Sequence, residues 1–237
     1  MIELKNLNVK FGGVVALDDI SATFSAPVSG IIGPNGAGKT TTMNVISGFL
    51  ASSGKISFEG EDITALTAYQ RTRWGLRRSF QHEQIADDLS VRDNLRVILD
   101  GISGGASEKR ADLNRALKFI DFSQRGDTLA ASLNSYERRL VDIARCLVGR
   151  PKVIMFDEPC GGLTQEETTH LGDLILQIGE LTGAITLVID HDVELIKRIC
   201  TQTLVIDFGK RIAFGETAKV LEDPKVQAAY LGIEEVA

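Results

Sequence analysis

The pattern of apolar and polar positions predicts strands at the start of the chain. Residues 2–32 are strand-like, with Gly12 and Gly13 as a turn and residues 28–32 as a short buried strand. A glycine-rich turn follows, and the next apolar spacing predicts a helix over 39–50. This order of strand, turn and helix is typical of an α/β protein.

Helical spacing dominates the middle of the chain. The α/β pattern first continues with a strand within 52–60 and a helix within 67–81 that breaks at Gly75 before another strand. From about 90 to 149 only helical periodicity is found, interrupted by a loop at 100–107. We expect this block to form a helical subdomain.

Strand patterns return in the last third of the chain. Three apolar runs separated by helical stretches occur at 152–157, 185–190 and 203–207. The sheet core is therefore expected to resume after the helical block and to continue toward the C-terminus. The chain contains no internal repeat, low-complexity segment or long linker.

The stretch "SLNSYERRL" (132–140) predicts a capped helix. Asn134 or Ser135 can cap the first amides, and Glu137 stands where a capping-box carboxylate reaches back. Arg138 and Arg139 are expected near the exposed start of the helix. Apolar residues at helical spacing form the expected buried face: Leu140, Ile143, Ala144 and Leu147.

Composition excludes several classes of protein. The 237 residues are 43% hydrophobic, which is enough for a packed core, and a net charge of −6 argues against a surface built to hold nucleic acid. The 3 cysteines have no spacing typical of a zinc site or disulfide framework, which fits a reducing cytosol. No apolar run approaches the roughly 18 residues of a membrane span, and the chain start is not a signal segment. Contact with a membrane is expected only through a partner.

The octapeptide "GPNGAGKT" at 33–40 predicts a phosphate-binding loop. It fits G-x-x-x-x-G-K-[ST] between a buried strand and a helix. Gly36 and Gly38 allow backbone amides to point at phosphate oxygens, next to the positive end of the helix. Lys39 is expected to reach the β and γ phosphates of a nucleotide, and the Thr40 hydroxyl is expected to hold Mg²⁺. The alternative, a glycine-rich structural turn, explains less of the motif.

Two adjacent acids follow a second buried strand. The run "VIMFDEP" ends in Asp157 and Glu158, at the edge of a sheet where ligands gather. Asp157 is the expected Mg²⁺ partner, and Glu158 the group that polarises an attacking water. Paired acids at a strand end are more often surface turn residues, but the phosphate-binding loop favours the catalytic interpretation.

In this order, "GPNGAGKT", Gln81 in "RSFQ", "FDEP" and His191 in "IDHD" resemble an ABC-type ATPase over the whole chain. The resemblance implies a P-loop NTPase core with a mixed sheet, an antiparallel β subdomain and an inserted helical subdomain. The expected boundaries make residues 1–237 one domain, with 1–89 and 150–237 as the core and about 90–149 as the helical subdomain.

The resemblance also assigns nucleotide contacts. Phe11 is expected to stack on adenine, Gln81 to lie in the Q-loop and bind Mg²⁺ with Thr40 and Asp157, and His191 to contact the γ-phosphate. Taken alone, Phe11 is more typical of a core residue, Gln81 of a loop amide and His191 of a structural histidine. The loop residues expected to contact ATP are Asn35, Gly36, Ala37, Gly38, Lys39, Thr40 and Thr41.

"LNSYE" at 133–137 occupies the place of the family signature, typically LSGGQ. The resemblance implies that its cap closes on ATP bound to a second subunit, through Asn134, Ser135, Tyr136 and Glu137. Ser135 and Tyr136 replace the two glycines of the signature. Thr164 likewise stands in the D-loop where aspartate is usual.

Further stretches resemble ATPases of branched-chain amino acid, urea and short-chain amide importers. These include "ALDDI" (16–20), "RSFQH" (78–82) and "VQAAYLG" (226–232). The implied function is an ATP-hydrolysing subunit that couples uptake of amino acids or similar small polar solutes to partner permeases. The implied partners are a second ABC ATPase, identical or related, two transmembrane permeases and, indirectly, a periplasmic solute-binding protein. The implied location is cytoplasmic, at the inner face of the membrane.

Two alternatives remain open: a catalytically weak regulatory ABC subunit, and an ABC ATPase that acts without a membrane. The basic stretch "RTRWGLRR" (71–78) could be a nucleic-acid patch around Trp74. We interpret it instead as a solvated helix face followed by an edge strand, and we expect no nucleic-acid partner.

Overall fold

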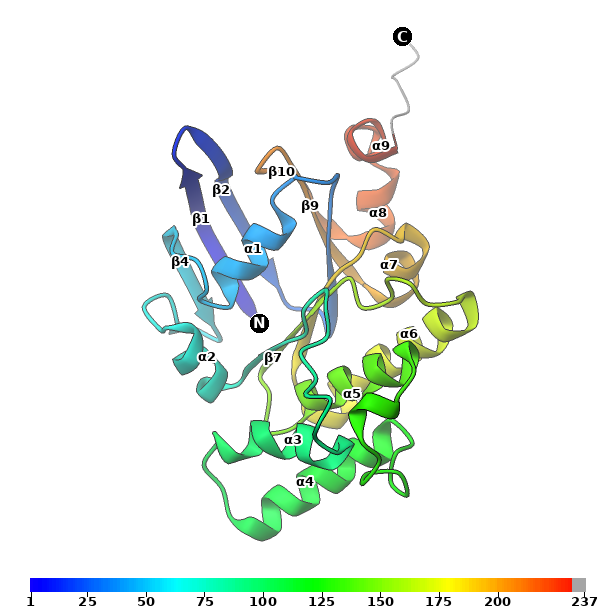
Figure 1. Ribbon diagram of the computed structural model, residues 1–237. Coiled ribbons are helices and arrows are strands. Elements are labelled where there is room, and N and C mark those ends of the chain that lie inside the picture. The colour runs from blue at the N-terminus through cyan, green and yellow to red at the C-terminus, as the bar shows by residue number, and fades with distance from the viewer. Residues whose placement is uncertain (232–237) are drawn as a thin grey trace.

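A computed structural model of the chain, which describes residues 1–231, contains one large mixed sheet. Its strand order is β10-β9-β3-β8-β7-β6 (Figure 1). Neighbouring strands are parallel except for β10, which is antiparallel to β9. The bounds in this order are Lys210–Glu216, Gln202–Asp207, Val28–Ile32, Ile185–Ile189, Val153–Asp157 and Leu76–Arg78.

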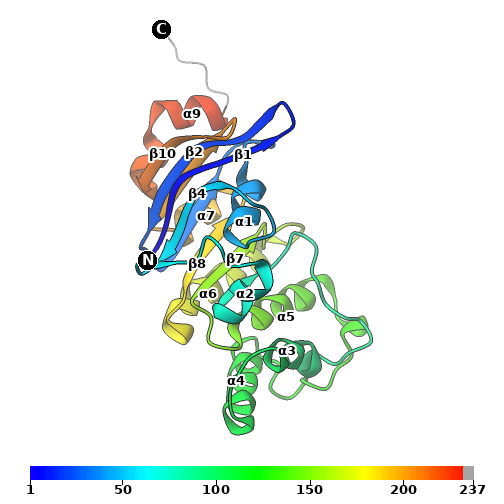
Figure 2. The same ribbon diagram turned by 90° about the vertical axis from the view of Figure 1, so that its left-hand side faces the viewer.

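The N-terminal part of the chain forms a smaller antiparallel sheet (Figure 2). Its strands follow the order β2 (Val14–Phe24), β1 (Ile2–Phe11), β4 (Ser53–Phe58) and β5 (Glu61–Asp62). Apolar side chains of this sheet and of one face of the large sheet pack into a common core, which also contains Met43 and Ile46 from the first helix. The mixed sheet and the antiparallel subdomain confirm the predicted fold class.

The helices form two groups. Those around the sheets are α1 (Lys39–Ile46), α2 (Ala68–Trp74), α6 (Gln165–Thr182), α7 (Val193–Ile199), α8 (Thr217–Glu222) and α9 (Pro224–Leu231). The others, α3 (Val91–Asp100), α4 (Ala106–Phe119) and α5 (Ser135–Leu147) with the 3₁₀ turn Ala130–Ser132, gather on one side, at the bottom of Figure 1. In residues 1–231, no helix combines the length and apolarity needed to cross a membrane.

Most predicted elements are present, with shifted ends. The helix expected over 39–50 ends at Ile46. β10 was not predicted, because its Lys, Arg and Glu residues and partly exposed positions obscure the strand pattern. All three cysteines are buried and unpaired. Gly232 of "VQAAYLG" lies outside the described residues.

The basic stretch at 71–78 differs from expectation, because Arg71 and Arg77 are buried, with exposed fractions of 3% and 4%. Arg71 donates to the carbonyls of Val45 and Ile46 at the end of α1, and Arg77 donates to two carbonyls just after α5. Helix C-termini leave such carbonyls without intrahelical partners. The solvated-face interpretation is therefore wrong for Arg71, whereas the edge strand predicted to follow, which contains Arg77, is confirmed as β6.

Arg139 is also buried, contrary to the expected exposed helix start. Only 5% of the residue is exposed, and its Nη2 lies 3.3 Å from the Glu83 carboxylate. The apolar face predicted for the same helix is buried as expected.

Candidate nucleotide-binding site

The predicted phosphate-binding loop joins β3 to α1. Gly33, Gly36 and Gly38 have φ values of 154°, 79° and 109°, which residues with a side chain rarely adopt. A Cβ at Gly33 would lie 2.0 Å from the Ile206 carbonyl oxygen, and one at Gly38 would lie 2.8 Å from that of Ala16. Glycine is therefore needed both for the turn and for the close approach of neighbouring backbone.

Lys39 lies in the centre of this loop, with 8% of the residue exposed. Its Nζ donates to the carbonyl oxygens of Gly33, at 2.7 Å, and Pro34, at 2.9 Å. Burial lowers the pKa of Lys39, while the charges of Glu158 and Asp157 oppose that shift. The ammonium thus faces the two acids predicted to act with it.

The other loop residues differ in what they can offer a ligand. Asn35, Gly36 and Thr40 are exposed, Gly38 and Thr41 are partly buried, and the Ala37 side chain is buried under the loop. The backbone of Ala37 is engaged within the protein, because its amide donates to the Pro34 carbonyl at 3.2 Å and its carbonyl accepts from the Gly209 amide at 2.8 Å.

Asp157 is the last residue of β7, and Glu158 follows it at the carboxyl edge of the large sheet. Asp157 is 6% exposed, and its Oδ2 accepts a hydrogen bond from Arg78 Nη2 at 2.8 Å. Glu158 adopts a left-handed conformation with φ of 50°, and its N–H donates to the Ile189 carbonyl at 2.8 Å. This hydrogen bond anchors Glu158 to the end of β8 and helps to hold its backbone in the strained conformation.

Gln81 and Glu158 are brought together although they are far apart in sequence. Gln81 Nε2 donates to Glu158 Oε2 at 2.9 Å. The amide dipole thereby orients the carboxylate predicted to activate water. The amide oxygen of Gln81 remains as a neutral ligand for a metal ion.

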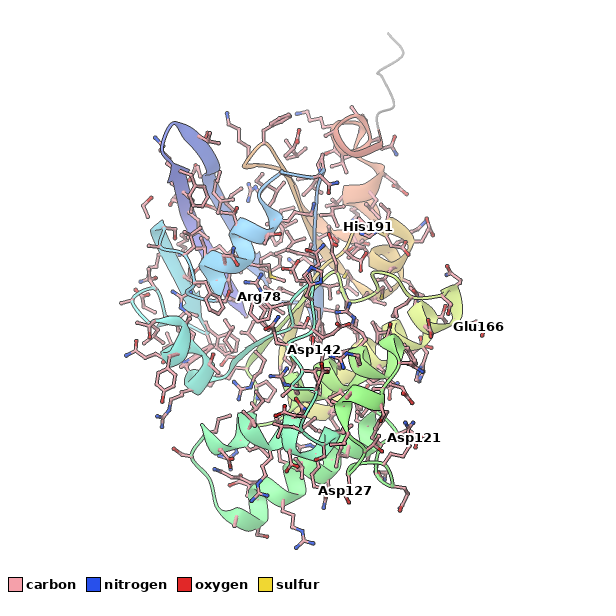
Figure 3. All side chains as sticks on the ribbon, viewed as in Figure 1. Arg78, Asp121, Asp127, Asp142, Glu166 and His191 are labelled. Carbon is pink, nitrogen blue, oxygen red and sulfur yellow. The ribbon has the colours of Figure 1, made fainter. Side chains whose placement is uncertain are left out.

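His191 follows β8, which lies between β3 and β7 in the sheet. The carboxyl ends of these three parallel strands carry the loop, the paired acids and His191, so all three lie at the same edge of the sheet. Figure 3 labels His191. His191 Nδ1 is 3.7 Å from Asp190 Oδ1, and 68% of the His191 side chain is exposed. Asp190 is buried, which raises its pKa, and it accepts from the Asp192 amide at 3.0 Å.

Phe11 is a surface aromatic residue. It ends β1 with 54% of the residue exposed, directly before the turn to β2. A core role is therefore excluded, which leaves the ring available for a ligand.

The chemistry of the predicted metal ligands fits Mg²⁺. Thr40, Gln81 and Asp157 provide a hydroxyl, an amide and a carboxylate, all hard oxygen donors. Among residues 1–231, no group of three or more His, Cys, Asp or Glu side chains is arranged to hold a metal ion. That suits Mg²⁺, which is commonly held by one or two protein oxygens together with nucleotide phosphates.

The "LNSYE" segment begins α5 with a complete capping box, as predicted. Asn134 Oδ1 accepts from the Glu137 amide at 2.9 Å, and Glu137 Oε2 accepts from the Asn134 amide at 3.1 Å. The Glu137 carboxylate also pairs with Arg125 at 2.6 Å, and this hydrogen bond lowers its pKa. Ser135 is exposed in the first turn of the helix.

Tyr136 is directed toward its own chain. Its hydroxyl is in hydrogen-bond contact with Nδ1 of His170 on α6, and its ring packs against the helical core. Burial raises the pKa of Tyr136, and the charge of Glu167 raises it further. The side chain that replaces a glycine of the usual signature is thus held between two helices.

Comparison with known proteins identifies the family. The ABC transporter family model matches residues 17–161. The chain belongs to the ABC transporter family. It is therefore an ATPase that couples ATP hydrolysis to transport.

Relatives match over almost the entire ABC chain. The branched-chain amino acid transport ATP-binding protein LivG of Escherichia coli K12 is 31% identical, covering 98% of each chain. The lipopolysaccharide export ATP-binding protein LptB of the same strain is 34% identical, covering 96% of this chain and 95% of LptB. The solved structure of MJ1267, an ATP-binding cassette in its ADP conformation, is 30% identical with a TM-score of 0.85, covering 98% of both chains.

The D-loop departure of this ABC chain has a local explanation. Thr164 is the N-cap of α6: its hydroxyl accepts from the Glu167 amide at 3.3 Å, and its own amide donates to the Glu167 carboxylate at 2.8 Å. Threonine and aspartate are both effective N-caps, so this substitution preserves the helix start.

Sequence reasoning missed Arg78 as part of the ABC site. It was interpreted as part of an edge strand leading to Gln81, without a role at the site, yet only 4% of its side chain is exposed and it pairs with Asp157. The available signal was its position three residues before Gln81, at the end of a strand next to the strand that carries Asp157.

Proposed function

We propose that this chain is the ATP-hydrolysing subunit of an importer for amino acids or similar small polar solutes. The near full-length similarity to LivG, together with the ordered site residues at one sheet edge, carries this proposal. The stretches "ALDDI", "RSFQH" and "VQAAYLG" also favour an importer subunit. The comparable similarity to LptB makes lipopolysaccharide export the alternative that the experiment must separate.

In this proposal the loop amides and Lys39 hold the triphosphate, and the exposed Phe11 ring stacks on adenine. Thr40, Asp157 and Gln81 hold Mg²⁺, which when bound offsets the negative charge of the phosphates. Glu158 accepts the proton of the attacking water, and Gln81 keeps its carboxylate oriented. His191 contacts the γ-phosphate.

A second ABC ATPase, identical or related, completes the site. In the proposed dimer the start of α5 closes on ATP held by the other subunit, through amides at a helix N-terminus. The oxygen of the Asn134 amide is used in the cap, so its nitrogen is left to donate to a phosphate. Support for this arrangement comes from the exposure of Asn134 and Ser135 at the helix start.

The permease is proposed to dock at a cavity of about 180 Å³ between the core and the helical group. Phe49 and Phe80 lie on its wall with ring centroids 5.9 Å apart, and Phe49 is 62% exposed. Gln84 and Ile98, from the segment that leads from Gln81 into the helical group, line the same cavity. An aromatic pair beside the Q-loop, of which Phe49 is exposed and Phe80 half-buried, suits an apolar partner helix. This docking would hold the chain on the cytoplasmic face of the membrane. A solute-binding protein would supply the permeases from the opposite, periplasmic face.

The experiment is solute uptake in a strain lacking this gene. Wild-type protein should restore uptake of labelled branched-chain amino acids, urea or short-chain amides, whereas Glu158→Gln should not, since an amide cannot accept the proton. The matched control Glu180→Gln changes an exposed glutamate of α6 and should restore uptake fully. Normal uptake in the deletion strain together with defective lipopolysaccharide export would replace the importer proposal by the exporter alternative.

A further inference from the structure

Arg78 connects three elements of the nucleotide site. It ends β6, and its Nη1 donates to Asn44 Oδ1 at 2.7 Å and to Ser47 Oγ at 2.9 Å, at the far end of the helix that begins with Lys39. Its Nη2 donates to Asp157 Oδ2 at 2.8 Å. One planar guanidinium thus joins the strand before Gln81, the phosphate-loop helix and the strand that carries the paired acids.

The surroundings leave the Arg78 guanidinium little freedom. Only 4% of its side chain is exposed, and the guanidinium carbon lies 4.8 Å from the centre of the Phe80 ring. Figure 3 labels Arg78 in the middle of the molecule, close to α1. A planar fork held by a ring on one side and by three side-chain acceptors at its edge has a defined orientation.

We propose that Arg78 is a positioning residue that orients the Asp157 carboxylate for Mg²⁺. Because Oδ2 is bound to Arg78, Oδ1 is the oxygen that remains for the metal or its water. The inference rests on the proposed metal role of Asp157. Arg78 itself is not a catalytic residue, because its contacts are with protein side chains.

Two opposing effects decide whether the Mg²⁺ affinity rises or falls when Arg78 is removed. The positive charge of Arg78 alone would weaken binding of a cation. Removing it, however, leaves the buried Asp157 carboxylate without its hydrogen-bond partner. The carboxylate can then rotate, and the oriented oxygen is lost. We expect the loss of orientation to outweigh the relief of repulsion.

The same contacts couple the proposed docking cavity to the metal ligand. Arg78 and Phe80 both line that cavity, and Phe80 contacts the exposed Phe49 ring edge-on. A partner that displaces Phe80 would move the face on which the Arg78 guanidinium rests. Through its contacts with Phe80 and Asp157, Arg78 therefore links the proposed permease-docking cavity to the position of the Asp157 carboxylate.

The test is a titration of the ATP-bound protein with Mg²⁺, in which calorimetry measures the Mg²⁺ affinity. A second titration, with ATP in the presence of EDTA, measures the metal-free ATP affinity as the reference. For Arg78→Ala we expect Mg²⁺ affinity to fall about tenfold, as for other residues that orient metal ligands, with ATP affinity in EDTA unchanged. The Mg²⁺ affinity of Arg78→Lys should lie between those of wild type and Arg78→Ala, because lysine keeps the charge near Asp157 but loses the planar fork.

Arg77→Lys is the matched control. Arg77 is the neighbouring buried arginine of β6, but it points to the opposite face and donates to backbone carbonyls. We expect this control to lower the thermal unfolding temperature without changing Mg²⁺ affinity. Should Arg78→Ala fail to fold, Arg78→Lys and Ser47→Ala supply the same comparison.

Unchanged or tighter Mg²⁺ binding in the folded Arg78 variants would overturn the inference. A wild-type protein whose ATP affinity does not depend on Mg²⁺ would instead refute the metal role proposed for the site. The two failures are therefore distinguishable.

Discussion

Lys39 illustrates how much a single side chain contributes at this site. Its ammonium is buried in the loop, satisfied by two carbonyl oxygens of that loop and held opposite two acids. Burial lowers its pKa, yet the acids favour the charged form. The Lys39 amine is thus placed where it can move from its own backbone to a phosphate.

At the residue scale we predict that Lys39→Ala lowers ATP affinity by about tenfold or more, since a charge-assisted hydrogen bond to phosphate is lost. Equilibrium titration with ATP and Mg²⁺ measures the change. Lys55→Ala is the control, because Lys55 is an exposed lysine of β4 paired with Asp62. Equal affinities of the Lys39 variant and wild type would refute the loop assignment.

Helix α5 shows how one element serves two parts of the site. Its first turn is the "LNSYE" cap, and further along Arg139 pairs with Glu83 while Arg145 donates to the Gln84 carbonyl. Both acceptors lie just after Gln81. The helix therefore holds the loop that carries Gln81, and Asp142 lies between the two arginines.

Asp142 makes this element sensitive to pH. Its pKa is raised to about 6, chiefly by burial, while the charges of Arg145 and Arg139 oppose the shift and that of Glu83 adds to it. In the unfolded chain the pKa is about 3.9. The folded protein therefore binds the proton more tightly, so the contribution of Asp142 to stability is full below about pH 4 and is lost as the pH rises to about 6.

At the element scale we predict that Asp142→Asn, which mimics the neutral acid, has the stability of wild type near pH 4. Above about pH 6 it should be more stable by about 1 to 3 kcal/mol. Urea unfolding of both proteins across this range measures the difference. Asp173→Asn on α6, where 56% of the side chain is exposed, should follow wild type at each pH. Parallel curves for wild type and Asp142→Asn would contradict the assignment.

In the proposed dimer, "LNSYE" is expected to act on the ATP of the other subunit. Each ATP in the proposed dimer contacts the loop of one subunit and the signature of the other, so a defect in this signature belongs to the partner's site. The structure adds that Tyr136 is held against His170, where a glycine would leave room for phosphate. One misplaced donor costs on the order of a hundredfold in rate.

At the whole-molecule scale we predict an asymmetric heterodimer. Glu158→Gln should nearly abolish ATP hydrolysis, because this chain's own site has its full set of residues, while the matching change in the partner should do much less. Steady-state ATPase assays of the assembled complex measure both, and restoring LSGGQ at 133–137 should raise the rate of the weaker site. Equal losses from the two glutamate changes, or an active homodimer with two working sites, would refute the asymmetry.

The sequence by itself determined the features that depend on local chemistry. The glycines and Lys39 of the phosphate-binding loop, the acids after a buried strand and the cap at Asn134 were all predicted, because each rests on backbone geometry within a few residues. The α/β class followed in the same way from the spacing of apolar residues.

Only the tertiary structure decided which distant groups meet. Arg71, Arg77 and Arg78 stand in one basic stretch of the sequence, and their burial depends on carbonyls and a carboxylate from other elements. The contacts of Gln81 with Glu158 and of Tyr136 with His170 arise in the same way, across long sequence separations. A charged or polar side chain is stable inside a protein only when partners are supplied there, and no local pattern records those partners.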